Sequence, residues 1–282
     1  MLDIVYLNGQ YLPKSAAQLN VSDLAILRGY GIFDYFRYLD GQPRFLADHI
    51  ERFFNSAREM YLDPPIDRAA LAEVVYQLIE RNGGGDGGIR FVMTGGYSDN
   101  GYTPNTPNLM AMAYPFTRPP KEQFEQGCKV MLHHYERQLP RVKTTDYIEG
   151  IRLLPKLKQV QADYPLYVDQ AGNVRESDRS NFFIVKNGEI ITPIDDILLG
   201  ITRMHLIKLA QQLDFKVAER TVSSKELLAA DEAIIASSTK GAMPIVQVDN
   251  HLIADGKPGP ITRQLMAAWP DYYANLILQQ QY

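Results

Sequence analysis

Hydrophobic and polar residues recur along the chain in patterns that predict both strands and helices. The apolar segments IVYL and QYL flank Asn8-Gly9, a pair that favours a type I′ turn and therefore a hairpin. Residues 30–37 are rich in apolar side chains and predict a strand, as do the segments IRFVMT and LMAMAY. Residues 45–62 carry apolar side chains at helical spacing, and a second helix is predicted near 69–81.

The second half of the chain shows the same two periodicities. Strands are predicted near 129–133 and 232–238, and NFFIVKNGEIITP predicts another hairpin around an Asn-Gly turn. Helices are predicted over about 148–162, over 201–213 and from Pro260 onward. These elements together predict a mixed α/β (α+β) fold.

A Pro-rich segment, PFTRPPKEQ, is the expected boundary between two domains. We expect a small α/β domain over residues 1–115, a linker over 116–122 and a larger domain over 123–282. The chain contains neither internal repeats nor a low-complexity region.

Composition narrows the class of protein. Of the 282 residues, 45% are apolar and 22% are charged, and the net charge of −4 argues against a general nucleic-acid binder. The single cysteine, Cys128, excludes an internal disulfide framework and fits a reducing cytoplasm. No segment approaches the roughly 18 to 20 consecutive apolar residues that a transmembrane helix needs. We therefore expect a cytoplasmic protein without a membrane partner.

Two residues carry the most informative chemistry, Lys143 in PRVKTTDY and Glu176 in NVRESDRSNFF. A lysine amine can hold an aldehyde cofactor as a Schiff base, and a carboxylate can keep a pyridine ring protonated as an electron sink. Either residue alone would be ordinary, because exposed Lys and Glu are common. The hypothesis therefore depends on the segments around them.

A phosphate-bearing cofactor also needs an anion site. Arg52 could bind phosphate bidentately, although it could equally be a solvated arginine on a helix face. In LLGITR, Gly200 precedes a helix start at Ile201-Thr202 whose N–H groups could face an anion, and simple capping by Thr202 is the alternative. SSTKG, at 237–241, adds hydroxyl groups at a strand end or forms only a turn.

Other motifs are rejected. The segment GGGDGG lacks the Lys-Ser/Thr of a phosphate-binding P-loop. His49-Ile50-Glu51 matches half of a zinc-deaminase pattern, but the PCxxC half is missing. No cluster has metal-ligand spacing, so we expect no metal site.

Taken together and in this order, six segments resemble the class IV, or fold-type IV, pyridoxal-phosphate aminotransferases. They are LRGYGIFDYFR, DHIERFFNSA, PRVKTTDY, VRESDRSNFF, LLGITR and ASSTKGAMPIVQVDN. The family includes D-amino-acid transaminases, branched-chain L-amino-acid transaminases and aminodeoxychorismate lyases. The resemblance implies pyridoxal 5′-phosphate as the cofactor, a small N-terminal domain, a larger pseudo-barrel domain and a homodimer with shared active sites.

The resemblance also implies roles for individual residues. Lys143 would be the Schiff-base lysine and proton carrier, and Glu176 would pair with the pyridinium nitrogen. Tyr147 would reach the phenolic oxygen of the cofactor, and Leu198 would pack on the ring face. The phosphate would be bound by Arg52 together with groups of Ile201, Thr202, Ser238 and Thr239.

Substrate choice is less clear, because the chain departs from each pattern of the family. Gly95-Gly96-Tyr97 stands where the familiar D-amino-acid transaminases have an Arg-x-His pair. Arg90-Phe91 only partly matches the Arg-Pro of the branched-chain enzymes, and SDNGY echoes an RGY segment of the lyases without its arginine. The chain therefore predicts a non-standard carboxylate clamp.

Three arginines are the candidates for that clamp: Arg28, Arg90 and Arg179. Arg179 lies three residues after Glu176, where the family usually has a small residue. Because unpaired guanidiniums in one pocket are costly, a dicarboxylate such as glutamate or 2-oxoglutarate would suit them. The alternative is that one or two of them pair with structural carboxylates such as Asp34 or Asp178.

A strongly positive pocket favours a transaminase for D-amino acids of the D-glutamate and D-alanine type, with 2-oxoglutarate or pyruvate as the 2-oxo acid. A branched-chain L-amino-acid transaminase is the first alternative and an aminodeoxychorismate lyase the second. A cofactor-binding protein without transaminase activity is the alternative from another class.

Overall fold

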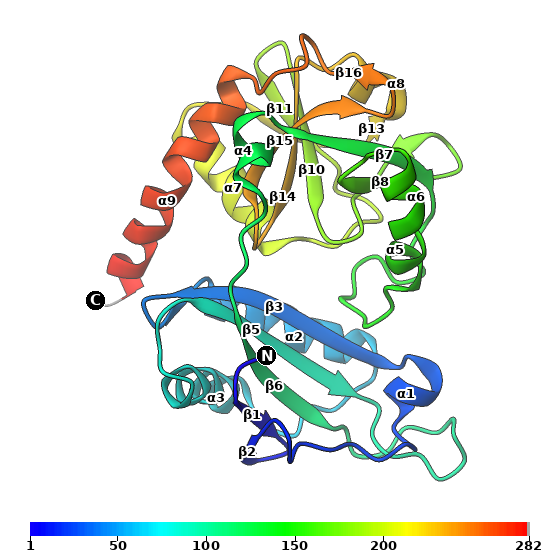
Figure 1. Ribbon diagram of the computed structural model, residues 1–282, viewed down its shortest axis with the longest axis vertical. Helices are drawn as coiled ribbons and strands as arrows, with labels where there is room; N and C mark the ends of the chain where they lie inside the picture. The colour runs from blue at the N-terminus through cyan, green and yellow to red at the C-terminus, as the bar shows by residue number, and fades with distance from the viewer. Residues whose placement is uncertain (281–282) are drawn as a thin grey trace. The chain divides into compact units, whose positions relative to one another are not determined.

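The computed structural model describes residues 1–280, which divide by their contacts into two compact units (Figure 1). The first unit contains Met1–Thr117 and the short segment Val142–Asp146, and the second contains Arg118–Arg141 and the chain from Tyr147 onward. The segment that carries Lys143 thus belongs to the first unit, although it lies beyond the linker expected from the sequence. None of the described helices has the length and apolar character needed to span a membrane.

The first unit is a six-stranded antiparallel sheet in the order β2-β1-β6-β5-β3-β4. Its strands are β1 (Ile4–Leu7), β2 (Gln10–Pro13), β3 (Gly31–Leu39), β4 (Gln42–Pro43), β5 (Gly87–Thr94) and β6 (Leu109–Pro115). Its helices are α1 (Leu24–Arg28), α2 (Leu46–Glu59) and α3 (Arg68–Arg81). Helices α2 and α3 pack on this sheet, and Phe36, Phe53 and Phe91 form edge-to-face pairs in the core between them (Figure 1).

The second unit is built on a ten-stranded mixed sheet in the order β12-β11-β10-β14-β15-β7-β8-β9-β13, with β16 beside β15. Its strands are β7 (Cys128–His134), β8 (Tyr164–Val168), β9 (Asn173–Val174), β10 (Asn181–Lys186), β11 (Glu189–Thr192), β12 (Val217–Glu219), β13 (Val222–Ser223), β14 (Glu232–Ser237), β15 (Gly241–Val248) and β16 (His251–Leu252). Its helices are α4 (Lys121–Glu125), α5 (Ile148–Arg152), α6 (Leu154–Gln159), α7 (Ile201–Gln212), α8 (Ser224–Leu228) and α9 (Pro260–Gln280). Helices α7 and α9 lie side by side (Figure 1).

Both predicted Asn-Gly hairpins are confirmed. Asn8 and Gly9 have φ of 47° and 91°, and Asn187 and Gly188 have φ of 51° and 78°. Two successive positive φ values are what a type I′ turn requires, and they align Leu7 with Gln10 in the first hairpin.

The single helix predicted over 148–162 is wrong, because the structure has two short helices, α5 and α6, in this range. Pro155 lies in the first turn of α6. It has no N–H to continue the hydrogen-bond ladder of α5, and its ring would clash with the carbonyl four residues before it. The helix therefore ends and a new one begins at this position.

Candidate active site

Lys143 is held by its backbone against strand β3 and helix α2 of the first unit. Its carbonyl accepts a 2.9 Å hydrogen bond from the N–H of Phe33, and its own N–H donates to Ser56 Oγ at 3.3 Å. The next residue, Thr144, forms a β-bridge with Ile32. The ammonium nitrogen lies 4.7 Å from the centre of the Phe33 ring. The backbone that carries the predicted Schiff-base lysine is therefore fixed at two points.

Helix α2 supplies the predicted phosphate arginine from the turn next to Ser56. Arg52 forms two hydrogen bonds to the buried carboxylate of Asp34, and its side chain is only 12% exposed. His49, one turn earlier, also contacts Asp34. Burial alone would raise the pKa of Asp34, but Arg52 and His49 hold it well below its usual value. Arg52 is thus a mostly buried, oriented guanidinium and not a fully solvated one.

Arg90 and Arg28, the other candidate arginines of the first unit, have no carboxylate at ion-pair distance among residues 1–280. Arg90 lies opposite Tyr35 in the β3–β5 ladder. Its guanidinium carbon is 5.4 Å from the centre of the Phe33 ring, the same ring that Lys143 approaches. Lys143 and Arg90 therefore flank one aromatic side chain.

Helix α1, which ends at Arg28, is anchored by Asp23, a buried residue that the sequence reasoning missed. One Asp23 oxygen caps the helix by accepting from the N–H of Ala25 at 2.8 Å. The other accepts from Thr94 Oγ1 and from Asn108 Nδ2, each at 2.7 Å. The carboxylate thereby ties the helix to the end of strand β5 and the start of β6.

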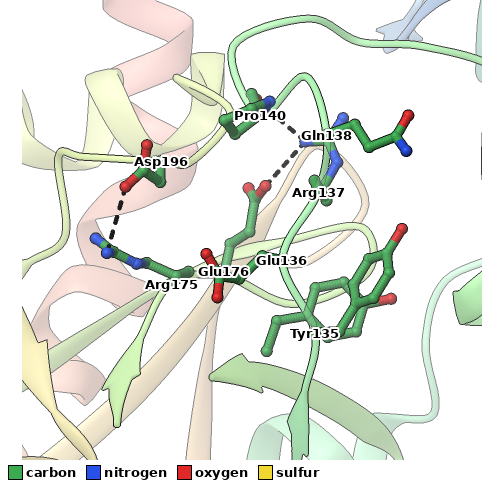
Figure 2. Close-up of a pocket in the computed structure, with 9 residues that line it drawn as sticks. Tyr135, Glu136, Arg137, Gln138, Pro140, Arg175, Glu176 and Asp196 are labelled. Carbon is green, nitrogen blue, oxygen red and sulfur yellow. Dashed lines mark hydrogen bonds and ion pairs between the residues drawn. The ribbon is translucent and has the colours of Figure 1, made fainter. Parts of the chain in front are cut away.

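In the second unit, Glu176 is 5% exposed and both of its carboxylate oxygens are hydrogen-bonded. Arg137 Nη1 donates to Oε1 at 2.9 Å, and the N–H of Leu198 donates to Oε2 at 3.1 Å. Figure 2 shows the Arg137 and Glu176 side chains pointing toward one another at a pocket of about 200 Å³. A buried carboxylate with this set of donors is stabilised in its charged form.

Asn181 connects Glu176 to the segment that enters helix α7. Its Nδ2 donates to the carbonyl of Leu198 at 2.8 Å and to Glu176 Oε2 at 3.4 Å. A Cβ at Gly200 would lie 2.0 Å from Asn181 Oδ1, so only glycine fits there. The structure thus brings together Glu176, Leu198 and the start of α7.

Helix α7 begins at Ile201 with Gly200 as its N-cap, and no side chain caps it. The predicted alternative of capping by Thr202 is therefore wrong, since the first-turn N–H groups have no side-chain acceptor in the described structure. Such a helix start is suited to bind an anion. Ser238 and Thr239, the other predicted phosphate residues, lie half-buried in the turn between β14 and β15.

Tyr147 and Arg179 belong to the same electrostatic environment as Glu176. Burial raises the pKa of Tyr147 to about 12, and the charges of Arg137, Asp178, Glu176 and Arg179 also act on its hydroxyl. Arg179 Nε donates to Asp178 Oδ2 at 3.0 Å, and the Arg179 side chain is 60% exposed. The predicted alternative of pairing with a structural carboxylate thus holds for Arg179 and Asp178. The predicted pairing of one of the three candidate arginines with Asp34 is wrong, because Asp34 pairs with Arg52.

Lys240 is a buried lysine of the second unit that the sequence reasoning did not single out. Its ammonium nitrogen donates to Ser180 Oγ at 3.2 Å and lies 4.2 Å from the centre of the Tyr164 ring. Burial, followed by repulsion from Arg179, lowers its pKa to about 8, while Asp178 and Cys128 act in the opposite direction. Its charged form is therefore destabilised in the folded protein.

Lys240→Met is expected to stabilise the protein at neutral pH. Between the folded-state pKa of about 8 and the ordinary value of 10.5, the unfolded chain binds more protons, so stability rises with pH. Below about pH 8 the full cost of charging Lys240 is present, on the order of 3 kcal/mol. Urea unfolding between these two pH values should show a rise in the free energy of unfolding of the wild type that the variant lacks. Parallel pH curves for the two proteins would contradict this reading.

No group of His, Cys, Asp and Glu within the described residues could hold a metal ion. Each unit carries groups of the kinds that pyridoxal 5′-phosphate requires. The first unit offers a fixed lysine and an oriented arginine, and the second offers an uncapped helix start and a buried carboxylate. These are the groups that an aldehyde-bearing pyridine phosphate requires.

Comparison with known proteins identifies the family. The family model described as amino-transferase class IV matches residues 31–248. A putative branched-chain-amino-acid aminotransferase of Methanocaldococcus jannaschii is 30% identical over 95% of both chains. A D-alanine aminotransferase of Staphylococcus haemolyticus is also 30% identical, over 95% of this chain and 97% of the relative.

The fold predicted from the sequence is confirmed by a solved structure. The branched-chain amino acid aminotransferase of Escherichia coli superposes with a TM-score of 0.91 at 24% identity, covering 97% of this chain and 95% of that one. The chain belongs to the class IV aminotransferases, a family of pyridoxal 5′-phosphate-dependent enzymes.

Proposed function

We propose that this enzyme moves an amino group between D-amino acids of the D-glutamate or D-alanine type and 2-oxo acids such as 2-oxoglutarate and pyruvate. The observation that carries the proposal is the pair of arginines in the first unit, Arg28 and Arg90, which have no carboxylate partner in the described structure. Arg90 lies beside the same Phe33 ring as Lys143. A substrate carboxylate near Lys143 would supply the missing counter-charge.

The residues named from the sequence would act on a cofactor whose pyridine ring accepts electrons during transamination when it is bound. Lys143 would hold the cofactor covalently between turnovers. Its amine would also carry the proton to and from the substrate α-carbon. Glu176, ionised and held by Arg137, would keep the ring nitrogen protonated.

The remaining predicted residues would orient the cofactor. Arg52 and the N–H groups at the start of α7 would bind the phosphate, with Ser238 and Thr239 contributing hydroxyls. Tyr147 would donate its hydroxyl to the phenolic oxygen, since it stays protonated with a pKa of about 12. Leu198, whose N–H fixes Glu176, would pack against the ring. A homodimer, in which the end of helix α1 with Arg28 completes the partner's site, is part of the proposal.

A branched-chain L-amino-acid transaminase is the second candidate, favoured by the relative from Methanocaldococcus jannaschii. Relatives named D-alanine aminotransferase are as similar, at 28–30% identity. The two candidates differ in their charge requirements. An apolar side chain such as that of leucine offers no partner to the guanidinium of Arg28 or Arg90, whereas the side-chain carboxylate of D-glutamate does.

Steady-state assays of the purified enzyme separate the two candidates. We expect turnover of D-glutamate with pyruvate, and at most slow turnover of L-leucine with 2-oxoglutarate. Turnover of only the L-pair would refute the D-amino-acid assignment. A colourless protein that does not change on addition of pyridoxal 5′-phosphate would instead indicate a protein without transaminase chemistry.

Although Arg179 pairs with Asp178, its side chain is 60% exposed, and we propose that it also binds the second carboxylate of D-glutamate. Arg179→Ser is then expected to raise the KM for D-glutamate at least about tenfold and that for D-alanine by less than about twofold. The reason is that a charge-assisted hydrogen bond contributes roughly 1.5–3 kcal/mol, and only the dicarboxylate carries a second carboxylate. Arg220→Ser is the matched control, because Arg220 is also partly exposed and paired with an acid, Glu226. Equal changes for both substrates would remove the role proposed for Arg179.

A further inference from the structure

The guanidinium of Arg52 is held in one orientation by a fork-to-fork contact. Its Nε donates to Asp34 Oδ2 at 2.8 Å, and its Nη2 donates to Asp34 Oδ1 at 2.7 Å. Asp34 is fully buried on strand β3, so the carboxylate cannot turn toward solvent. Because the guanidinium is planar and rigid, two bonds to one carboxylate fix both its plane and its rotation.

His49 and Tyr35 complete the set of donors to Asp34. The N–H of Tyr35 donates to Oδ1 at 2.7 Å, and His49 Nδ1 lies 2.8 Å from the same oxygen. Burial lowers the pKa of His49, so the ring is neutral at neutral pH. The proton on Nδ1 then points to Asp34, because Arg52 Nη2, at 3.3 Å from Nδ1, is itself a donor.

This contact divides the five N–H groups of Arg52 into two sets. Two of them face Asp34, and Nη2 also lies 3.3 Å from His49 Nδ1, whereas the two on Nη1 have no partner among the described residues. The side chain is 12% exposed. The unpaired Nη1 end of the guanidinium therefore points away from Asp34, and an incoming anion would find its two donors already aligned.

We propose that Asp34 and His49 are positioning residues for the phosphate end of the cofactor, acting through the orientation of Arg52. The proposal rests on the proposed function, in which Arg52 binds that phosphate. The ion pair with Asp34 also cancels the charge of Arg52. Orientation and attraction are thus opposed: removal of the carboxylate loses the alignment but leaves a stronger net positive charge.

Because the two effects are opposed, the direction of the change in affinity shows which of them is larger. The ligands are pyridoxamine 5′-phosphate and pyridoxamine, which differ only in the phosphate and do not bond covalently to Lys143. Their dissociation constants are measured by fluorescence on the full-length protein freed of cofactor. If positioning dominates, Asp34→Asn weakens the binding of pyridoxamine 5′-phosphate at least about tenfold, whereas the affinity for pyridoxamine changes less than about twofold. Asp34→Glu, which keeps the carboxylate, should restore part of the loss.

Unchanged or tighter binding of pyridoxamine 5′-phosphate by folded Asp34→Asn would overturn the inference. Arg52→Met separates this result from a failure of the proposed function. If Arg52→Met also leaves the affinity unchanged, Arg52 does not bind the phosphate and the proposed function loses that residue. If Arg52→Met weakens binding and Asp34→Asn does not, only the positioning role falls.

A pair of His49 variants keeps the inference testable if Asp34→Asn does not fold. His49→Asn retains an N–H near the position of Nδ1, whereas His49→Leu removes it. We expect His49→Leu to weaken the binding of pyridoxamine 5′-phosphate at least about threefold more than His49→Asn does. The affinity for pyridoxamine should be unaffected in both variants. Equal affinities of the two variants for pyridoxamine 5′-phosphate would contradict a positioning role for His49.

Discussion

Replacement of Lys143 with alanine is expected to abolish transamination and to remove the visible absorbance that arises from the bond between this lysine and the cofactor. The loss should be at least about 10⁴-fold, because one amine both attaches the cofactor and transfers the proton, and proton transfer alone contributes about 10²–10⁴-fold. The structure supports a specific effect on the site. The Lys143 backbone is held by Phe33 and Ser56, contacts that an alanine side chain leaves in place.

The control for this variant is Lys186→Ala, which removes an exposed lysine paired with Asp231 in the second unit. It should keep both the absorbance and the rate. Turnover by Lys143→Ala at more than about one hundredth of the wild-type rate would contradict the assignment of the catalytic lysine, since even the weakest general base contributes more than that.

Replacement of Glu176 with glutamine is expected to lower kcat by about 10²–10³-fold while the protein stays folded and coloured. An amide of the same shape can still accept from the N–H of Leu198, but it carries no charge to stabilise a protonated ring nitrogen. It also leaves Arg137 without its buried counter-charge, so a small loss of stability should accompany the loss of rate.

Glu232→Gln is the matched control for the carboxylate in the second unit. Glu232 is buried to the same extent and accepts from the backbone N–H groups of Ile261 and Thr262, remote from Glu176 in sequence. We expect it to lower the melting temperature and leave kcat unchanged. A Glu176→Gln enzyme with wild-type kcat would show that the charge of Glu176 is not needed.

Local chemistry determined which elements the sequence could predict. Asn-Gly pairs specify type I′ turns regardless of context, so both hairpins were found, and the helical spacing over 45–62 corresponds to α2, which covers 46–59. The helix predicted over 148–162 failed at Pro155, a local signal that the apolar spacing concealed. Proline breaks the hydrogen-bond ladder whatever the periodicity around it.

Contacts between residues far apart in sequence determined what the sequence could not predict in the site. The pairing of Asp34 with Arg52 joins a strand to a helix, and the pairing of Arg137 with Glu176 joins two loops of the second unit. In neither pair are the two residues separated by a characteristic number of positions that a single sequence could reveal. His49 and Arg52, three residues apart on one helix face, were the one available signal for the Asp34 cluster.

The three arginines proposed to bind substrate also differ in how far the sequence predicts their surroundings. Arg179 was expected either to face the substrate or to pair with a neighbouring acid, and adjacency to Asp178 made the ion pair predictable. The surroundings of Arg90 were not predictable, because Phe33, Tyr35 and Tyr114 approach it from two other strands. These rings leave its charge without a carboxylate partner, and the D-amino-acid proposal depends on that charge.

The most direct measurement is a single-turnover reaction of the cofactor-loaded enzyme with D-glutamate and, separately, with L-glutamate, followed by the change in cofactor absorbance. The two substrates have identical groups and charges, so the ratio of their rate constants reports which enantiomer the pocket accepts. We predict that D-glutamate reacts at least about 100-fold faster, a difference of about 2.7 kcal/mol in the barrier. Equal rates, or a faster reaction with L-glutamate, would contradict the account.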